Sequence, residues 1–213
     1  MKKALQIAIQ VLFLALFTGL VILGKVQVWM AVFLIGGVLT SLLFSRIYCG
    51  WLCPINTLIK ATAWVKKKLH IGSFKIPLFI KKPWIRYVFL GLFIALFAFS
   101  MISGKHIPVL PILVAIGVFI SLLFPEELWH CYICPYGTIL SLPASKAVKS
   151  LRINEEVCIS CGKCKKSCQV NAVIQEDKTF SIDKKECLVC MACVEACSSD
   201  AIHLEKSKDS VNK

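Results

Sequence analysis

Cysteine is the residue type whose number and spacing in this sequence point most directly to chemistry. The chain has 213 residues and 12 cysteines, and eight of these cysteines form two runs with one spacing, C-x2-C-x2-C-x3-C. The first run covers residues 158–168, and the second covers residues 187–197. Thiolates are soft ligands that suit iron–sulfur clusters, zinc and copper(I). Two runs with the same spacing therefore predict metal ligation.

The spacing of the two runs favours clusters over single ions. In two-cluster bacterial ferredoxins with this spacing, the first three cysteines of a run bind one cluster and the fourth binds the other. The sequence therefore predicts two [4Fe–4S] clusters. The first is expected on Cys158, Cys161, Cys164 and Cys197, and the second on Cys187, Cys190, Cys193 and Cys168. The alternative is a pair of structural zinc sites, but zinc needs four ligands per site and has no use for a third cysteine at this spacing.

The remaining four cysteines lie in two short motifs that end in proline. Residues 48–54 read Tyr-Cys-Gly-Trp-Leu-Cys-Pro, and residues 130–135 read His-Cys-Tyr-Ile-Cys-Pro. Proline suits the first turn of a helix, which predicts that the second cysteine of each motif lies at a helix N-terminus, where the dipole favours a thiolate. We therefore expect a third centre, iron–sulfur or another metal, on Cys49, Cys53, Cys131 and Cys134. The alternative is that these are small buried apolar residues beside structural prolines.

Four apolar runs provide the elements that must carry these motifs. Hydrophobic residues make up 57% of the chain and charged residues 17%, which is more apolar and less charged than soluble domains are. Each run has roughly 17–20 residues without a charge, about enough for a helix to cross a hydrocarbon core. The sequence therefore predicts four membrane-spanning helices. They are expected at Ala4–Leu23, Val28–Phe44, Tyr87–Ser103 and Ile107–Phe124.

An internal repeat with a period of 80 residues relates the first two runs to the last two. Phe13–Phe17 matches Phe93–Phe97, and Ser41–Phe44 matches Ser121–Phe124. The first run alone is also compatible with a signal peptide, but its copy lies in the middle of the chain, where no signal peptide occurs. The repeat therefore predicts two helical hairpins of the same orientation, and a Cys-Pro motif follows the second helix of each.

The distribution of charge predicts the topology. Residues 1–124 hold 13 Lys and Arg and no acidic residue, whereas residues 125–213 hold 12 of each. The excess of +13 therefore flanks the apolar runs, which argues against a nucleic-acid partner. The basic loop 46–86 is expected on the cytoplasmic side of a multi-pass protein of the cytoplasmic membrane. Both termini and all cysteines then lie in the cytoplasm, where thiols stay reduced and metal ligation is favoured over disulfides.

These observations predict the domain organisation and fold class. A membrane all-α four-helix domain, made of two parallel-repeat hairpins, is expected over residues 1–135, followed by a linker over residues 136–151. A C-terminal α+β two-cluster bacterial ferredoxin domain is expected over residues 152–205. Residues 206–213 form a polar tail.

This combination of parts resembles the NapH-type membrane polyferredoxins. The shared features are four spans, a C-x3-C-P motif after the second, a C-x2-C-P motif after the fourth and a terminal two-cluster ferredoxin. The C-terminal region of NosR and the CcoG-type proteins are similar in the same parts. The resemblance implies two C-x3-C-P motifs, so this chain departs from it by one residue between Cys131 and Cys134.

The resemblance implies a function that the motifs alone do not specify. It implies electron transfer between the quinone pool, or a cytoplasmic donor, and a partner redox protein or membrane complex. The expected role is that of an electron-transfer subunit of the quinol dehydrogenase type. The sequence contains no G-x-G-x-x-G or P-loop pattern, so neither nicotinamide nor nucleotide chemistry has support. We assign no catalytic residue. The alternative, implied by the CcoG-type proteins, is a metal-handling factor that reduces a metal ion while an oxidase matures.

Overall fold

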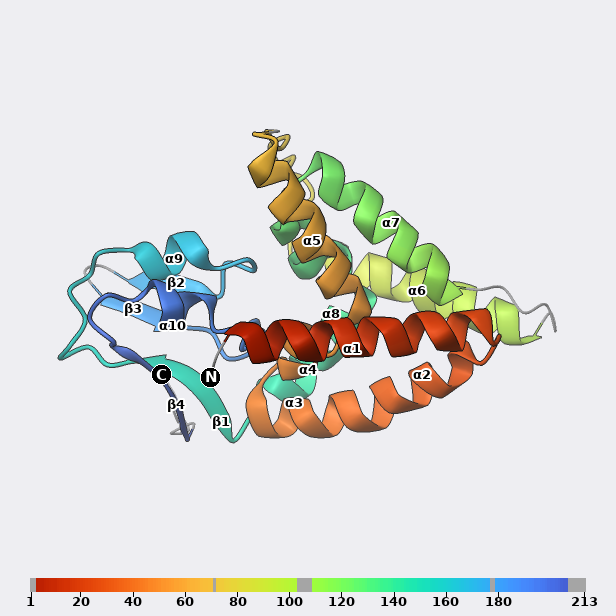
Figure 1. Cartoon of the computed structure of the whole chain (residues 1–213), viewed down its shortest axis with the longest axis horizontal. Helices are drawn as coiled ribbons and strands as arrows, with labels where there is room; N and C mark the ends of the chain where they lie inside the picture. Colours follow the sequence, from red (N-terminus) through yellow and green to blue (C-terminus); the bar gives the residue numbers. More distant parts are fainter. Residues whose placement is uncertain (1–2, 71, 103–108, 177–178, 207–213) are drawn as a thin grey trace. The chain divides into compact units, whose positions relative to one another are not determined.

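The computed structural model describes residues 3–70, 72–102, 109–176 and 179–206. The chain folds into two compact units, and each unit combines two segments of the sequence. Met1–Leu34 and Trp51–Ile139 form the first, which we call the helical unit, and Ile35–Gly50 and Leu140–Lys213 form the second, which we call the sheet unit. Figure 1 labels the helices and strands of both.

The helical unit begins with two apolar helices joined by a tight turn. Helix α1 spans Lys3–Ile22 and α2 spans Val26–Val32. Gly24 has a left-handed backbone conformation, with φ of 68°, and the Lys25 amide donates a hydrogen bond to the Leu20 carbonyl at 2.9 Å. This is a Schellman turn, which glycine enters without the steric penalty of a Cβ atom. The turn allows α2 to pack against α1.

The helical run that follows contains a π turn. After α2 come the π turn η1 (Phe33–Gly37) and helix α3 (Val38–Phe44), so the run expected from residue 28 to residue 44 is helical. A second π turn, η2 (Leu128–Ile133), carries one of the Cys-Pro cysteines. Such turns are rare inside helices and occur frequently at functional sites.

The second pair of apolar runs forms helices α6 (Ile85–Ile102) and α7 (Val109–Leu123). They correspond to the runs expected over residues 87–103 and 107–124, of which residues 103, 107 and 108 lie outside the described part. Within the described part of the chain, α1 is the one helix that is long and apolar enough to cross a membrane. The shorter apolar helical runs are Val28–Phe44, Ile85–Ser100 and Val109–Leu123.

Helix α5 (Pro54–Lys68) packs against α1 and α7. Gly117 of α7 allows Trp129 and Ile55 to lie close to this helix. A Cβ atom on Gly117 would lie 3.0 Å from Cζ2 of Trp129 and 3.2 Å from Cγ2 of Ile55. A side chain at this position would require the indole ring or Ile55 to shift by a few tenths of an ångström. The core of the helical unit therefore depends on a small residue where α5, α7 and η2 meet.

Lys66 caps the C-terminus of α7 from inside the protein. Its buried ammonium group donates hydrogen bonds to the carbonyls of Ser121 at 3.0 Å and Phe124 at 3.2 Å, and to the Ser73 hydroxyl at 2.8 Å. Burial lowers the pKa of Lys66, although the carboxylate of Glu126 raises it. A cation at this end also interacts favourably with the helix dipole.

The internal repeat is visible in the local structure of α3 and α7. Ser41 and Ser121 occupy matching positions of the repeat, and both are buried. Each hydroxyl donates a hydrogen bond of 2.8 Å to the carbonyl three residues earlier, at Val38 and Val118. A buried serine within an apolar helix satisfies its hydroxyl in this way. The matching sequence letters therefore correspond to matching geometry.

The sheet unit has two antiparallel strand pairs and two short helices in addition to α3 and α4 (Ile47–Trp51). Strand β1 pairs with β4, and β2 pairs with β3. The buried side chains of Leu151, Phe180 and Ile202 contribute to its core. The strands and helices are β1 (Lys149–Ile153), α9 (Lys163–Ser167), β2 (Val173–Glu176), β3 (Thr179–Ile182), α10 (Ala192–Ala196) and β4 (Ile202–Lys206).

Residues 136–151, which we expected to form a linker, are more ordered than that description implies. Helix α8 covers Pro135–Ala144, and β1 begins at Lys149. Gly137 and Pro143 lie inside α8, and both residue types have low helix propensity. Packing outweighs propensity here, since Leu140 and Ala144 are fully buried.

Candidate metal centres

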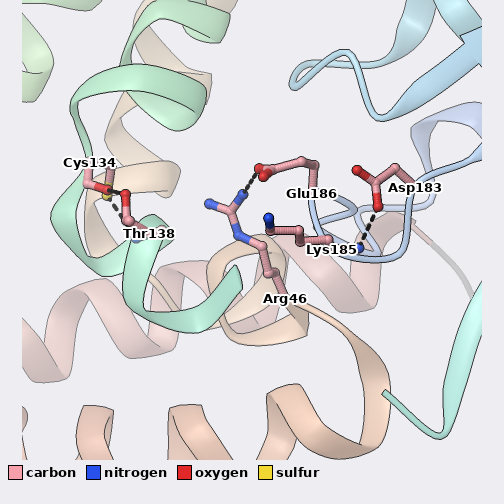
Figure 2. Close-up of polar contacts among 7 residues, drawn as sticks. Arg46, Cys134, Thr138, Asp183, Lys185 and Glu186 are labelled. Carbon is pink, nitrogen blue, oxygen red and sulfur yellow. Dashed lines mark hydrogen bonds and ion pairs between the residues drawn. The ribbon is translucent and has the colours of Figure 1, made fainter. Parts of the chain in front are cut away.

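Two equivalent turns lead into the two cysteine runs. Asn154 lies four residues before Cys158, and Asp183 lies four residues before Cys187. The side-chain oxygen of each accepts a hydrogen bond from the amide two residues on, at 3.0 and 2.9 Å, and Figure 2 shows the second of these, from Lys185. Each backbone carbonyl accepts the amide of the first cysteine, at 3.1 and 3.0 Å. These Asx turns reverse the chain so that a tight loop can begin.

The two cysteine loops share an unusual backbone. Three pairs of matching residues have positive φ angles, between 49° and 71°. Positive φ is uncommon outside glycine, and for a β-branched residue such as Val189 it is an outlier. The Val189 amide lies 3.4 Å from Sγ of Cys187, so this conformation directs an N–H group at a sulfur. The pairs are Ser160 and Val189, Gly162 and Met191, and Asn171 and Asp200.

The structure brings together the four cysteines that we expected to bind the first cluster. They line one half-open cavity with Phe180, Ile153 and Ile202, and its empty space is about 310 Å³, part of it open to solvent. Three of these cysteines come from the first run and one from the second, so residues of both runs meet at this cavity. We call this group the open ligand set: Cys158, Cys161, Cys164 and Cys197.

Hydrogen bonds to sulfur favour the thiolate within the open ligand set. Burial raises the pKa of Cys197, but hydrogen bonds from the Ser199 hydroxyl and from the Ala201 amide outweigh it, so the pKa is lowered. The Ala201 amide lies 3.3 Å from this sulfur. For Cys164, burial is the largest influence and raises the pKa. A positive cluster core would offset this cost of burying a thiolate, because metal binding requires the deprotonated form.

The cysteines expected to bind the second cluster are also neighbours. Burial raises the pKa of Cys187, and the charges of the other three thiolates raise it further. Burial also raises the pKa of Cys193 to about 12, again with contributions from neighbouring thiolates. Helix α9, which ends directly before Cys168, packs against α10, which carries Cys193, so the two runs lie side by side. We call this group the buried ligand set: Cys168, Cys187, Cys190 and Cys193.

Each ligand set is composed of four cysteines. Within the described residues, no group of three or more His, Cys, Asp or Glu side chains is close enough to hold a single metal ion. One zinc ion would draw its four ligands together, whereas in a cubane each thiolate binds a different iron atom. Four thiolates in each set match the number of protein ligands of a four-iron cluster, which would supply one-electron chemistry.

Both Cys-Pro motifs place a cysteine directly before a helix, as the sequence predicts. Cys53 precedes α5, and Cys134 precedes α8, and each has an extended backbone with ψ of 118° and 110°. The hydroxyls of Thr57 and Thr138 donate to the carbonyls of these cysteines, at 3.1 and 3.2 Å. Figure 2 shows the second of these hydrogen bonds. The two motifs thus share one local structure from the second cysteine onward, whereas the first cysteine lies in the α-helix α4 in one motif and in the π turn η2 in the other.

Tyr136 links the surroundings of Cys53 and Cys134. Burial raises the pKa of this tyrosine, and the charges of Cys134 and Cys53 raise it further, so both cysteines belong to its surroundings. Its ring packs edge-on against Phe33 and Phe93. The Gly137 amide lies 3.4 Å from the Cys134 sulfur. Two of the four expected ligands therefore share one buried aromatic environment within the helical unit.

The other two cysteines of these motifs have different surroundings. Cys131 lies in η2 and is half-buried, and it belongs to the helical unit. Cys49 lies in α4, is buried and belongs to the sheet unit. Burial raises the pKa of Cys49, while the charge and hydrogen bond of Arg46 lower it.

Arg46 connects its motif to the second cysteine run. Its side chain is 0% exposed, and Nη1 forms an ion pair of 2.8 Å with Oε2 of Glu186 (Figure 2). Its backbone amide donates to the Cys187 carbonyl at 3.1 Å. A buried guanidinium requires such partners, because desolvation of an unpaired charge is costly.

Sequence reasoning missed three residues of these sites. Glu186 lies directly before the second run, and its pairing with an arginine far away in sequence leaves no local signal. Gly50 packs against the backbone of Leu188. Its place between Cys49 and Cys53 was the feature of the sequence that could have indicated this contact. Asn56 is buried on α5, and neither polar atom of its amide has a hydrogen-bond partner within the described structure. Its position three residues after Cys53 was the signal.

Two family models match the chain over the segments just described. The model described as "4Fe-4S binding domain" matches residues 26–72 and 106–154, so it covers both Cys-Pro motifs. The model described as "4Fe-4S dicluster domain" matches residues 150–198 and covers both cysteine runs. These matches identify iron–sulfur binding regions in both parts of the chain.

Curated relatives have names that refer to ferredoxins and electron transport. A candidate electron transport protein, YccM of Escherichia coli (strain K12), is 27% identical over 63% of this chain and 44% of its own. The ferredoxin-type protein NapH of Haemophilus influenzae is 24% identical over 63% of this chain and 51% of its own. The regulatory protein NosR of Pseudomonas aeruginosa is 25% identical over 62% of this chain and 21% of its own. These matches span about half of the relatives' length or less, and no solved structure matches the chain.

Proposed function

Because the chain belongs to the NapH-type polyferredoxins, we propose that it transfers electrons in the cytoplasmic membrane between the quinone pool and a partner redox protein. Its relatives are ferredoxin-type proteins, and its cysteine-rich regions match 4Fe-4S binding models, which gives it an iron–sulfur electron-transfer role.

The observation that carries this proposal is the pairing of the two cysteine runs. We propose that the open ligand set and the buried ligand set each hold one [4Fe–4S] cluster. The proposal is supported by a cavity lined by three cysteines of the first run and Cys197 of the second. It is also supported by the mutual effect of the thiolates on the pKa of Cys187. Exchange of the fourth ligand is a property of two-cluster ferredoxins.

We further propose that Cys49, Cys53, Cys131 and Cys134 hold a third metal centre at the cytoplasmic boundary of the membrane. The family model that covers both motifs, and the common position of Cys53 and Cys134 before proline-started helices, support this centre. Amide groups at a helix N-terminus favour thiolate sulfur. Replacing Cys53 and Cys134 by serine should remove one paramagnetic signal and its iron, whereas unchanged iron and signals would reduce these cysteines to packing residues.

The membrane part of the proposal rests on apolar helices and on the basic loop. Helix α1 is long and apolar enough to span a bilayer, and the shorter apolar runs Val28–Phe44, Ile85–Ser100 and Val109–Leu123 are the other three spans of the proposal. The basic loop 46–86 orients them with its lysines in the cytoplasm. A reporter fused after residue 213 should be active only in a form that works in the cytoplasm. Activity of a periplasmic reporter at that position would reverse the orientation.

A direct test of the quinone proposal uses purified protein without oxygen. Oxidation of a quinol to a quinone releases two electrons and two protons. Each [4Fe–4S] cluster takes up one electron, so the two proposed clusters together would accept the electrons of one quinol while the protons pass to solvent. Protein reduced with dithionite should be reoxidised by duroquinone, or oxidised protein reduced by duroquinol, and paramagnetic resonance follows either change. If neither occurs while dithionite still reduces the protein, the quinone proposal is wrong. Reduction of cupric ion in its place would favour the metal-handling alternative.

A further inference from the structure

The two ligand sets have matching loops but very different surroundings. The first cysteine of each run is followed by an apolar residue. This residue is Ile159 in the loop of the open ligand set and Leu188 in the loop of the buried ligand set. Ile159 is 65% exposed, whereas Leu188 is 1% exposed. The next residue is exposed at Ser160 and fully buried at Val189. Because both loops have the same backbone conformation, this difference comes from what covers them.

The segment Ser45–Gly50 packs on the loop of the buried ligand set. The Arg46 amide donates to the Cys187 carbonyl at 3.1 Å, and its guanidinium pairs with Glu186 at 2.8 Å. These contacts lie within the sheet unit, which includes both parts of the chain. The segment also carries Cys49. One Cys-Pro motif is therefore fixed to one of the two cysteine loops.

Gly50 allows this close packing. A Cβ atom at this position would overlap the carbonyl oxygen of Leu188 and lie 3.6 Å from Cα of Cys190. The contact is with backbone atoms, so no side-chain rotation can relieve it. Tyr132 is the residue that follows the first cysteine of the other Cys-Pro motif, so the motifs differ at this position. The glycine thus meets a packing requirement particular to the first motif.

We propose that Arg46 and Gly50 are positioning residues for the buried ligand set and join it, and not the open ligand set, to the Cys49 motif. The inference rests on the proposed function in one respect, since both ligand sets must hold clusters. Arg46 is the buried cation of this loop, and a positive charge next to a cluster raises its reduction potential. The loop of the open ligand set has its Ile159 side chain 65% exposed. Electron transfer at either set forms or breaks no bond and moves no proton.

The first test adds one methyl group. In the full-length protein, Cys161→Ser and Cys190→Ser assign the two cluster signals in paramagnetic resonance. Gly50→Ala should then change or abolish the signal of the buried ligand set, with about a 10-fold loss of occupancy, and leave the other signal unchanged. Gly36→Ala is the matched control, because nothing lies within 4 Å of the added atom in the same unit. Equal effects on both signals, or none, would overturn the inference.

The second test depends on the sign of a charge and needs no steric change. Arg46→Gln should lower the reduction potential of the buried ligand set, Glu186→Gln should raise it, and Arg46→Lys should restore it. If the pair had only a structural role, Arg46→Gln and Glu186→Gln would shift the reduction potential in the same direction. Shifts of the same sign, or an equal shift of the open ligand set, would contradict the proposal. Wild-type protein without iron–sulfur signals would instead refute the proposed function itself.

Discussion

Removing either partner of the Arg46–Glu186 pair should have very unequal effects on the stability of the sheet unit. Glu186→Gln leaves a guanidinium that is 0% exposed without its carboxylate. Removal of one partner of a buried pair costs about 3–5 kcal/mol, because the other charge stays desolvated. Arg46→Gln leaves a carboxylate that is 18% exposed and can be hydrated. Its cost is closer to one hydrogen bond to a charged group, roughly 1–2 kcal/mol.

Brief proteolysis in urea measures this difference, because it cleaves the unfolded form and leaves the folded form intact. With a slope of about 2 kcal/mol per molar urea, Glu186→Gln should lower the midpoint by about 2 M and Arg46→Gln by about 0.5–1 M. The double variant Arg46→Met with Glu186→Met should be less destabilised than Glu186→Gln alone, since no charge remains buried. Equal shifts for the two single variants would refute the reasoning, and so would a larger shift for Arg46→Gln.

Three further predictions concern the helical unit. Burial raises the pKa of the Glu126 carboxyl to about 6. The stability that its protonated form contributes is therefore present below the unfolded pKa and is lost as the pH rises through 6. Glu126→Gln should therefore stabilise the protein by roughly 2 kcal/mol at neutral pH and flatten the pH profile of thermal unfolding between about pH 4.5 and 7. Lys66→Met should destabilise the unit by about 1.5–3 kcal/mol, through loss of hydrogen bonds to the carbonyls at the end of α7, while the exposed Lys67→Met should change little. Burial of the Asn56 amide without hydrogen-bond partners costs about 1–3 kcal/mol. Asn56→Leu removes this cost and should raise the melting temperature of metal-free protein. A lower melting temperature would mean that the amide has a structural partner.

Local sequence signals predicted local structure in this protein. Proline after Cys53 and Cys134 marked the first turn of a helix, and both helices begin there. The repeat predicted matching positions, and Ser41 and Ser121 have matching hydrogen bonds. Each of these features depends on residues within about one helical turn. The cysteine spacing likewise depends on short loops, which suits prediction from sequence.

Features that depend on distant residues were not predictable in the same way. Arg46 and Glu186 are separated by 140 positions, and nothing near either residue marks the other. Val189 has a φ of 50°, a conformation that its own side chain disfavours and that the loop around the cysteines imposes. Residues 135–144 contain Gly137 and Pro143, which favour a linker, yet tertiary packing of Leu140 makes them a helix.

The central claim is that this chain is an iron–sulfur electron-transfer protein with clusters on its paired cysteine runs. The most direct measurement is the iron, sulfide and zinc content of the full-length protein purified without oxygen, together with paramagnetic resonance after reduction. The account predicts about eight irons on the two cysteine runs, four for each cluster, and further iron if the Cys-Pro motifs bind a third cluster. It also predicts that Cys190→Ser and Cys161→Ser each remove a different signal. Zinc in place of iron, or one signal that both variants remove, would contradict the account.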